Sequence, residues 1–313
     1  MTASTDSFSA PASASSPVAP PSPDPQAFGQ RLFIQRRHIQ EAFIGPDPDA
    51  PSARPLQPGQ ARLAIDSFSL TANNVTYAAF GEAMQYWQFF PSGQEGLGCL
   101  PVWGFPTVCE SGVEGVPVGR RLWGYWPAGT HLVVQPARVG PAGFVDGAAH
   151  RQGLAAVYNQ ILFCDADPGW TPEGEGLQAV LRPLFMTAWL LDDFLAGQGY
   201  FGARQVLLAR PPRPRRMACR RGAPRRAHPG SWASPPHATQ ASSKGWGAAE
   251  LQRRMAQAWS SDIALVQAQQ WMRIVRHRGA AQVLQAHLDM VAGQADAQKG
   301  WMLDLHANPE AGR

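Results

Sequence analysis

The most promising polar chemistry in this sequence lies in one short segment, Leu70-Thr-Ala-Asn-Asn-Val-Thr-Tyr. Asn73, Asn74 and Tyr77 follow an apolar run with the pattern of a strand, which predicts that they occupy a loop at its end. An amide N–H or a phenol O–H can donate a hydrogen bond without titrating near neutral pH. The three residues are therefore candidates for neutral hydrogen-bond donors in a functional site. Alternatively, the asparagines form a turn and Tyr77 packs in the core.

Four further side chains are candidates for the walls of a substrate pocket. Trp87 and Phe89 lie in one aromatic stretch, and Tyr158 and Asn159 stand together in another segment. Aromatic side chains cluster in cores as well as in binding sites, so core packing is the alternative for this group.

The cysteines and histidines do not have the spacing of a metal site. The four cysteines form no CxxC pair, and no Cys/His group has zinc-finger spacing. We therefore expect no metal, no disulfide framework and a reducing, cytoplasmic location. His131 is interpreted as a strand-end histidine that bonds the backbone, and Asp192-Asp193 as a solvated helix face rather than an acid/base pair.

Charge is unevenly distributed along the 313 residues. The formal charge is +4, yet residues 209–226 hold eight Arg and no acid, so the remainder carries −4. An acidic remainder argues against a nucleic-acid-binding body. Residues 1–27 are mostly Ser, Ala and Pro, which predicts a disordered head and no signal peptide. No run approaches the ~18 apolar residues of a membrane span, so no membrane partner is expected.

Short strand patterns separated by Gly and Pro predict a small, barrel-like β domain in residues 28–150. The clearest strands are expected at Ala61–Asp66, Pro101–Val108 and His131–Gln135. In residues 151–208, apolar spacing predicts helices followed by a buried strand. The helices are expected at Leu154–Phe163 and Leu177–Leu195, and the strand at Arg204–Leu208.

Residues 248–313 are expected to form C-terminal helices and a final strand. One helix should run from Ser261 to Arg278 and a second should end at Val291, and the strand is expected at Trp301–Leu305.

The pattern breaks at residues 209–247, which are rich in Arg and Pro and almost devoid of aliphatic side chains. This composition predicts a disordered, aberrant linker. Translation of GC-rich DNA out of frame would produce such a composition, so a frameshift is one explanation. A second is an Arg-rich tract that binds nucleic acid or an acidic partner through its charges.

Several segments resemble a known superfamily. Pro58–Asp66 with Leu70–Tyr77, and Val118–Gly124, are similar to the opening stretches of medium-chain dehydrogenases/reductases. Phe68–Tyr86, Ala142–Gln160 and Arg182–Leu208 resemble, more closely, an uncharacterised bacterial domain-of-unknown-function family within that superfamily. The resemblance implies an α+β or α/β fold with two domains, a GroES-like β-rich catalytic domain and a Rossmann domain. It also implies that NADPH binds in the cleft between these two domains.

The resemblance also implies a class of chemistry. Where zinc-dependent members carry a Cys and a Gly-His-Glu segment, this chain has Ala72-Asn73-Asn74 and Val102–Phe105. That difference implies a zinc-free quinone or enoyl reductase, in which Asn73, Asn74 or Tyr77 stabilises a developing enolate.

The cofactor site implied by the resemblance is damaged at the sequence level. A pyrophosphate needs backbone N–H groups after the first Rossmann strand, and the prolines of Ala209–Pro214 have none. Too few residues follow for a complete Rossmann domain, so we expect only a remnant of it and exposed apolar surface on Leu177–Leu195. The chain is thus expected to be a reductase impaired in this copy, or a non-enzymatic or non-functional product.

Overall fold

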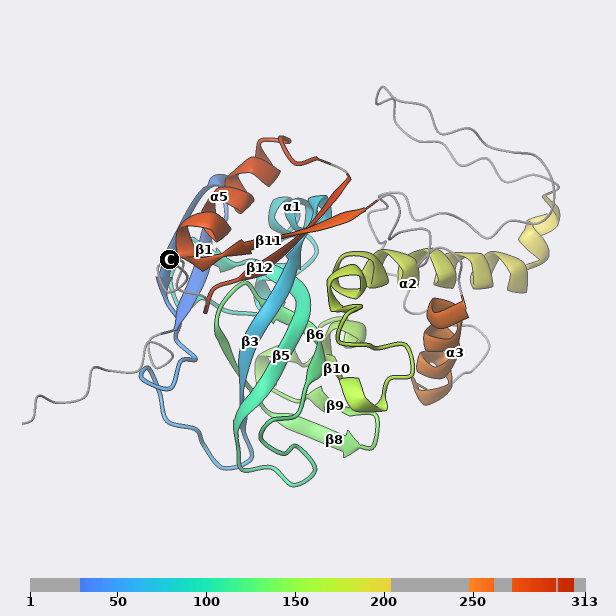
Figure 1. Ribbon diagram of the computed structural model, residues 1–313, viewed down its shortest axis with the longest axis horizontal. Helices are drawn as coiled ribbons and strands as arrows, with labels where there is room; N and C mark the ends of the chain where they lie inside the picture. Colours follow the sequence, from blue (N-terminus) through green and yellow to red (C-terminus); the bar gives the residue numbers. More distant parts are fainter. Residues whose placement is uncertain (1–28, 204–247, 262–271, 297, 307–313) are drawn as a thin grey trace, which may run out of the picture.

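Two β-sheets form the body of the molecule, and the larger one unites N-terminal and C-terminal parts of the chain (Figure 1). The computed structural model describes residues 29–203, 248–261, 272–296 and 298–306. The strands are β1 Gln30–Gln35, β2 His38–Pro46, β3 Ala61–Leu70, β4 Leu97–Cys99, β5 Pro101–Ser111, β6 Leu122–Pro127, β7 His131–Val134, β8 Pro136–Gly140, β9 Gly143–Asp146, β10 Gln160–Phe163, β11 Arg273–Arg278 and β12 Lys299–Asp304.

The smaller sheet has the order β2-β1-β4, and the larger has the order β11-β12-β3-β5-β6-β10-β9-β8, with β7 also pairing with β3. Few helices accompany these strands, so the fold is mixed α+β. The α-helices are α1 Ala72–Ala79, α2 Glu175–Gly197, α3 Ala248–Ser261 and α5 Gly279–Val291. In the described part of the chain, no helix is long and apolar enough to span a membrane.

The strands β3 and β5 form the centre of the larger sheet. Alternation along Ala61–Asp66 correctly predicts the first part of β3, and the strand continues to Leu70 with most residues buried on both faces. Phe68 of β3 and Phe105 of β5 are completely buried in the main hydrophobic core. The close pairing of β3 and β5 requires a glycine at position 104, because a Cβ there would lie 2.2 Å from the backbone oxygen of Ser67.

The C-terminal part completes the larger sheet. The strand expected at Trp301–Leu305 is present as β12, which pairs antiparallel with β3 so that Trp301 faces Leu70 in the register. The helix expected through Val291 is confirmed as α5, and it connects β12 to the parallel strand β11. This is the only parallel pairing among the strands of the described residues.

The expected helix from Ser261 to Arg278 is wrong over its last six residues, which form β11. Two β-branched residues, Ile274 and Val275, favour the extended backbone, and pairing with β12 overrides the helical spacing. Gly279 then adopts a φ of +76°, where the chain turns into α5. Residues 262–271 of this expected helix lie outside the described residues.

The helix expected over Leu154–Phe163 is also wrong. A short 3-10 turn spans Ala156–Asn159, and β10 follows directly. Ile161 and Phe163 alternate with more exposed neighbours and enter the core as β10 pairs with β6 and β9. The apolar residues therefore suit a strand as well as a helix, and the neighbouring strands decide between them.

The helix expected over Leu177–Leu195 is confirmed as α2, which ends at Gly197. Its first half is buried against the body, where Ser69 Oγ donates to the backbone oxygen of Ala179 at 2.8 Å. From Pro183 onward most side chains are partly exposed, and Leu191 is 41 % exposed. The prediction of exposed apolar surface is thus confirmed for the second half of α2, which extends away from the sheets (Figure 1). The prediction is wrong for the first half, which is buried.

Ion pairs attach the first half of α2 to the body. The guanidinium of Arg121, the residue before β6, binds Glu175 through two hydrogen bonds of 2.9 and 2.7 Å and also pairs with Asp66 of β3. At the end of the buried half, Arg182 pairs with the buried Asp167 carboxylate. These contacts fix the helix end that contributes to the candidate site below.

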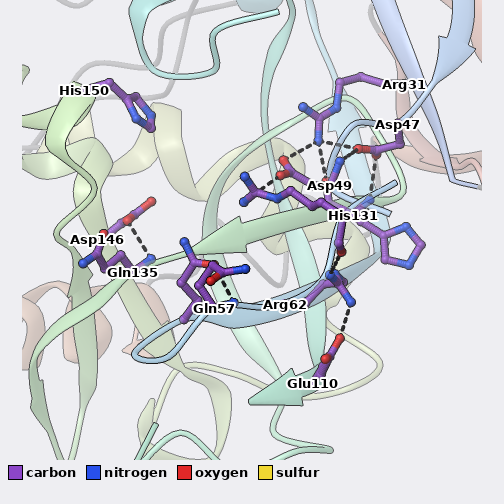
Figure 2. A network of polar contacts seen from close by, with 12 residues as sticks. Arg31, Asp47, Asp49, Gln57, Arg62, Glu110, His131, Gln135, Asp146 and His150 are labelled. Atoms are coloured by element: carbon purple, nitrogen blue, oxygen red, sulfur yellow. Dashed lines mark hydrogen bonds and ion pairs between the residues drawn. The ribbon is translucent and has the colours of Figure 1, made fainter. Parts of the chain in front are cut away.

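A buried ion-pair network ties the N-terminal strands to the loop before β7 (Figure 2). Arg31 Nη2 lies 2.7 Å from Asp47 Oδ1 and 2.9 Å from Asp49 Oδ2. The Asp47 carboxylate also accepts hydrogen bonds from the backbone N–H groups of Thr130 and His131, at 3.1 and 2.9 Å. Burial lowers the pKa of His131 to about 4, so its imidazole is neutral at pH 7. Its Nδ1 atom lies 3.0 Å from the Thr130 hydroxyl, a side-chain partner in place of the expected backbone group.

Replacement of Asp47 should test how far the body depends on this network. Asp47→Asn removes one of the two charges facing Arg31 and leaves a buried guanidinium less compensated, so the free energy of unfolding should fall by roughly 3–5 kcal/mol. Urea denaturation followed by tryptophan fluorescence measures the change. The control is Glu82→Gln, at an exposed pair with Arg36, where a change below about 1 kcal/mol is expected. Equal losses in the two variants would contradict a special role for Asp47.

Candidate functional site

The candidate site begins where β3 turns into α1. Thr71 N donates to Asn74 Oδ1 at 2.7 Å, and the same carboxamide donates from Nδ2 to the Pro101 carbonyl at 2.8 Å. The prediction that Asn73, Asn74 and Tyr77 occupy a loop is wrong, because Asn74 closes the first turn of a helix by capping. The helix brings Asn73 and Tyr77, four residues apart, onto the same face.

Asn73 and Tyr77 form a hydrogen-bonded pair. The Asn73 Nδ2 atom donates to the Tyr77 hydroxyl oxygen at 2.8 Å. Because the phenol oxygen accepts this bond, its own hydrogen is directed elsewhere, and the side chains of Trp103 and Tyr158 also lie within hydrogen-bonding reach of this hydroxyl. Tyr77 is buried and Asn73 is half-buried, so the pair lies at a boundary between the core and solvent.

Four of the five tyrosines in the chain, including Tyr77 itself, form a cluster of rings. The Tyr77 ring centroid lies 4.6 Å from that of Tyr86 and 5.7 Å from that of Tyr125. Tyr158 completes the tyrosine cluster, with its ring 4.5 Å from Tyr125 and its hydroxyl 3.4 Å from the hydroxyl of Tyr86. Phe89 packs edge-on against both Tyr125 and Tyr158, at 5.6 and 5.2 Å.

The tyrosine cluster is strongly desolvated. Burial raises the pKa of the Tyr77 and Tyr158 phenols, and also those of Tyr86 and Tyr125. These hydroxyls therefore stay protonated far into the alkaline range. They can donate hydrogen bonds, but they do not act as phenolate bases at neutral pH.

Arg151 holds Tyr158 in the cluster. Its guanidinium forms a buried ion pair with Asp146 at 2.9 Å and donates to the Tyr158 carbonyl at 3.3 Å and to Asn159 Oδ1 at 3.2 Å. Asn159 Nδ2 donates back to the Arg151 carbonyl at 3.3 Å. Asn159 therefore lies behind the tyrosines, where it orients the short turn that carries Tyr158.

A small hollow opens beside Asn73 and Tyr77, between the start of α1, β5 and α2, with a cavity volume of about 10 Å³. This space is about that of one water molecule, so a larger ligand would enter only if the lining side chains moved apart. One wall is polar, one is the indole of Trp103, and one is an apolar part of α2. The lining residues are Ser69, Thr71, Asn73, Asn74, Tyr77, Trp103, Ala179, Val180, Pro183 and Leu184.

The structure places only some of the expected site residues at this hollow. Asn73, Asn74 and Tyr77 line it. Phe89 and Tyr158 pack in the tyrosine cluster behind Tyr77 rather than in the wall. Trp87 is a core residue: it fills the space beside two glycines, and a Cβ on Gly81 would lie 2.2 Å from its Nε1.

Sequence reasoning misses Tyr86, Tyr125 and Trp103. The first two come from a 3-10 turn and from β6, and they meet Tyr77 only through the tertiary fold. Trp103 Nε1 is buried and faces the Tyr77 hydroxyl, although the two atoms do not meet strict hydrogen-bond geometry. The sequence contains eleven tryptophans, and nothing in the pattern around Trp103 distinguishes it from the others.

The described residues offer no set of three or more His, Cys, Asp or Glu side chains that could hold a metal ion. The three cysteines among them, Cys99, Cys109 and Cys164, are free thiols. The segment Ala209–Pro214, where a cofactor turn was expected, lies outside the described residues, as do Arg204–Leu208 and the remainder of 209–247.

Comparison with known families gives one result. Residues 68–211 match a family described as a protein of unknown function, DUF2855. The matched stretch is similar to that family and runs from within β3, through α1 and the tyrosine cluster, to the end of α2 and beyond. It therefore includes every residue that lines the hollow. No curated protein matches the chain.

Alkaline titration should separate the tyrosine cluster from Tyr200. Tyr200 is the one tyrosine outside the cluster, and a hydrogen bond to Asp192 raises its pKa modestly. Absorbance at 295 nm should show one phenol ionising in the folded protein and four ionising only as the protein unfolds. The unfolded phenols lose protons near pH 10 while the folded ones retain them, so stability should fall as the pH rises above about 10.

The variant Tyr200→Phe provides the control for this titration. It should abolish the early ionisation and leave the later, cooperative step unchanged. If two or more phenols ionised while the far-UV circular dichroism remained native, the desolvation of the tyrosine cluster would be disproved.

Proposed function

We propose that this chain is a zinc-free, reductase-type protein that retains a binding pocket for a small carbonyl compound and has lost most of its capacity for nicotinamide-dependent reduction. The observation that carries the proposal is the Asn73–Tyr77 pair at the hollow, with 2.8 Å between the amide nitrogen and the phenol oxygen. A desolvated donor held in a fixed position is what an enzyme needs to polarise a carbonyl or to stabilise an enolate.

The roles of the residues follow from the geometry. The Tyr77 hydroxyl accepts from Asn73 and donates its own hydrogen to the ligand oxygen. Asn74 fixes the helix start that positions the pair, through its bonds to Thr71 and Pro101. The apolar body of the ligand would lie against Val180 and Leu184 of α2, after the side chains that line the hollow move apart to admit it.

NADPH is the cofactor implied by the resemblance to medium-chain reductases, and the described residues do not fit it. A dinucleotide fold presents helix N-termini at the ends of several parallel strands. Among the strands of the described residues only β11 and β12 pair in parallel, and the short helix α5 joins them. We therefore derive no step through NADPH, and we attribute the loss to the aberrant segment that begins at Ala209.

A non-enzymatic or truncated product is the alternative function. The observation that favours it is the second half of α2, whose apolar side chains are partly exposed although helices of this composition are normally covered. In that alternative the tyrosine cluster serves only as core. A frameshift in the gene would account for both the exposed helix and the Arg-rich segment, and sequencing of the gene across residues 209–247 tests it.

Two titrations test the proposed function. Cyclohexenone should bind the purified full chain saturably, as followed by quenching of tryptophan fluorescence, and Tyr77→Phe should weaken this binding about 2- to 10-fold because one hydrogen bond is lost. Nicotinamide fluorescence should show no saturable binding of NADPH or NADH at micromolar concentration.

The matched control is Tyr200→Phe, which removes a phenol remote from the hollow and should leave the affinity unchanged. Unchanged affinity in Tyr77→Phe would refute the assigned donor. Saturable micromolar binding of NADPH would refute the proposed loss of reduction, and an assay of quinone and enone reduction would then be the next measurement.

A further inference from the structure

We propose that the C-terminal unit, residues 273–296 and 298–306, is attached to the body by a set of histidine contacts that hold at neutral pH and weaken in mild acid. In this unit α5 packs on β2 and α1, and β12 pairs with β3 (Figure 1). Because Trp301 of β12 faces Leu70 in that pairing, the attachment also holds the strand end that leads into α1. It belongs to the fold and requires no ligand in the hollow.

Two histidines of the C-terminal unit are hydrogen-bonded to the body. The Nε2 atom of His287 in α5 lies 2.9 Å from the Ile39 carbonyl oxygen of β2. The Nε2 atom of His306, which follows β12, lies 2.9 Å from the Thr130 carbonyl oxygen. A carbonyl oxygen only accepts, so each Nε2 carries a hydrogen and donates it. In a neutral imidazole of this tautomer Nδ1 has no hydrogen, and acid adds both a proton and a charge there.

Burial makes a charged imidazole unfavourable inside the docked unit. His287 is 1 % exposed, and burial lowers its pKa more than the bond to the Ile39 carbonyl raises it. Among the described residues, no carboxylate of β2, α1, β11 or β12 contributes to this pKa. Burial also lowers the pKa of His277 in β11, whose ring lies 5.0 Å from that of Trp301, and Asp289 of α5 offsets part of this effect.

A third buried histidine, His131 of β7, meets the end of the C-terminal unit. Its ring lies 5.1 Å from that of His306, at an interplanar angle of 80°. Burial and the neighbouring His306 imidazole lower the pKa of His131 to about 4. The guanidinium groups of Arg62 in β3 and Arg31 in β1 act in the same direction, and the Asp49 carboxylate acts against them (Figure 2).

The direction of the pH effect follows from these lowered pKa values. An exposed imidazole has a pKa near 6.5, so an open unit binds more protons than a docked one. Docking is therefore strongest above about pH 6.5 and weakens as the pH falls toward the lowered values. The carboxylates of Asp47 and Asp49 are engaged by Arg31, so they compensate a charge on His131 only in part.

Hydrogen exchange of the full chain, followed by mass spectrometry, tests the proposal. Exchange rates at pH 7.5 and pH 5.0, each divided by the intrinsic rate at that pH, give a protection factor for each peptide. Peptides from α5 and β12 should lose about 10-fold or more in protection at pH 5.0, whereas peptides from β5 and β6 should keep theirs. Equal protection of β12 at the two pH values would overturn the proposal. Equal losses in β5 and β12 would also overturn it, because they describe unfolding of the whole body.

Replacement of His287 identifies the group responsible. In His287→Gln the amide can still donate to the Ile39 carbonyl but does not titrate, so protection at pH 7.5 should stay native. The loss of protection at pH 5.0 should be smaller by about 3-fold or more than in the native chain. His38→Gln, at an exposed histidine one residue before Ile39, is the matched control and should keep the full loss.

His306→Gln gives a second case at a half-buried position, where an amide can replace the imidazole donor to the Thr130 carbonyl. It also removes the imidazole that lowers the pKa of His131, so its loss of protection at pH 5.0 should again be smaller than in the native chain. If His287→Gln fails to fold at pH 7.5, the native chain and His306→Gln decide the question. If the folded variants all retain the native loss, the histidines do not carry the pH effect and the proposal fails.

Discussion

The candidate site depends on the carboxamide of Asn74. Its oxygen accepts from the backbone of Thr71 and its nitrogen donates to the carbonyl of Pro101, so one buried side chain joins the end of β3, the start of α1 and the start of β5. Without these bonds the first turn of α1 would lack its cap, and the spacing that brings Asn73 to the Tyr77 hydroxyl would not be fixed. The polar pair at the hollow is thus a consequence of how one short helix begins.

Buried arginines hold the irregular segments around this helix. Arg151 with Asp146 anchors the turn that carries Tyr158, and Arg182 with Asp167 attaches α2 to the loop before it. Such pairs gain little net stability, because desolvation offsets most of their attraction, but an unpaired buried charge would be strongly unfavourable. They therefore select one arrangement of segments that have no regular backbone pairing of their own.

The sequence correctly predicts elements that have a long, continuous pattern of apolar spacing. It does not predict elements whose choice between helix and strand depends on contacts with distant segments. Leu177–Leu195 carries enough turns of apolar spacing to be recognised as a helix, and Gly197 and Gly199 mark its end. In contrast, Ile161 and Phe163, like Ile274 and Val275, have spacing compatible with either state, and their strand partners are distant in sequence. At the site, Asn73 and Tyr77 are recognisable by residue type. Tyr86, Tyr125 and Trp103 are not, because only the folded sheet brings them to the same place.

Whether the tyrosine cluster is only core can be argued from its hydroxyls. Phenylalanine would fill the same space at a lower cost of desolvation wherever a phenol finds no acceptor. The Tyr125 hydroxyl is buried and has no hydrogen-bond partner in the described part of the chain. A buried phenol without a partner, 5.7 Å from Tyr77 between ring centroids, is a local violation of the rules of core packing. Violations of this kind concentrate at binding sites, where a ligand supplies the missing partner, so the hydroxyls favour a site over a purely structural aromatic core.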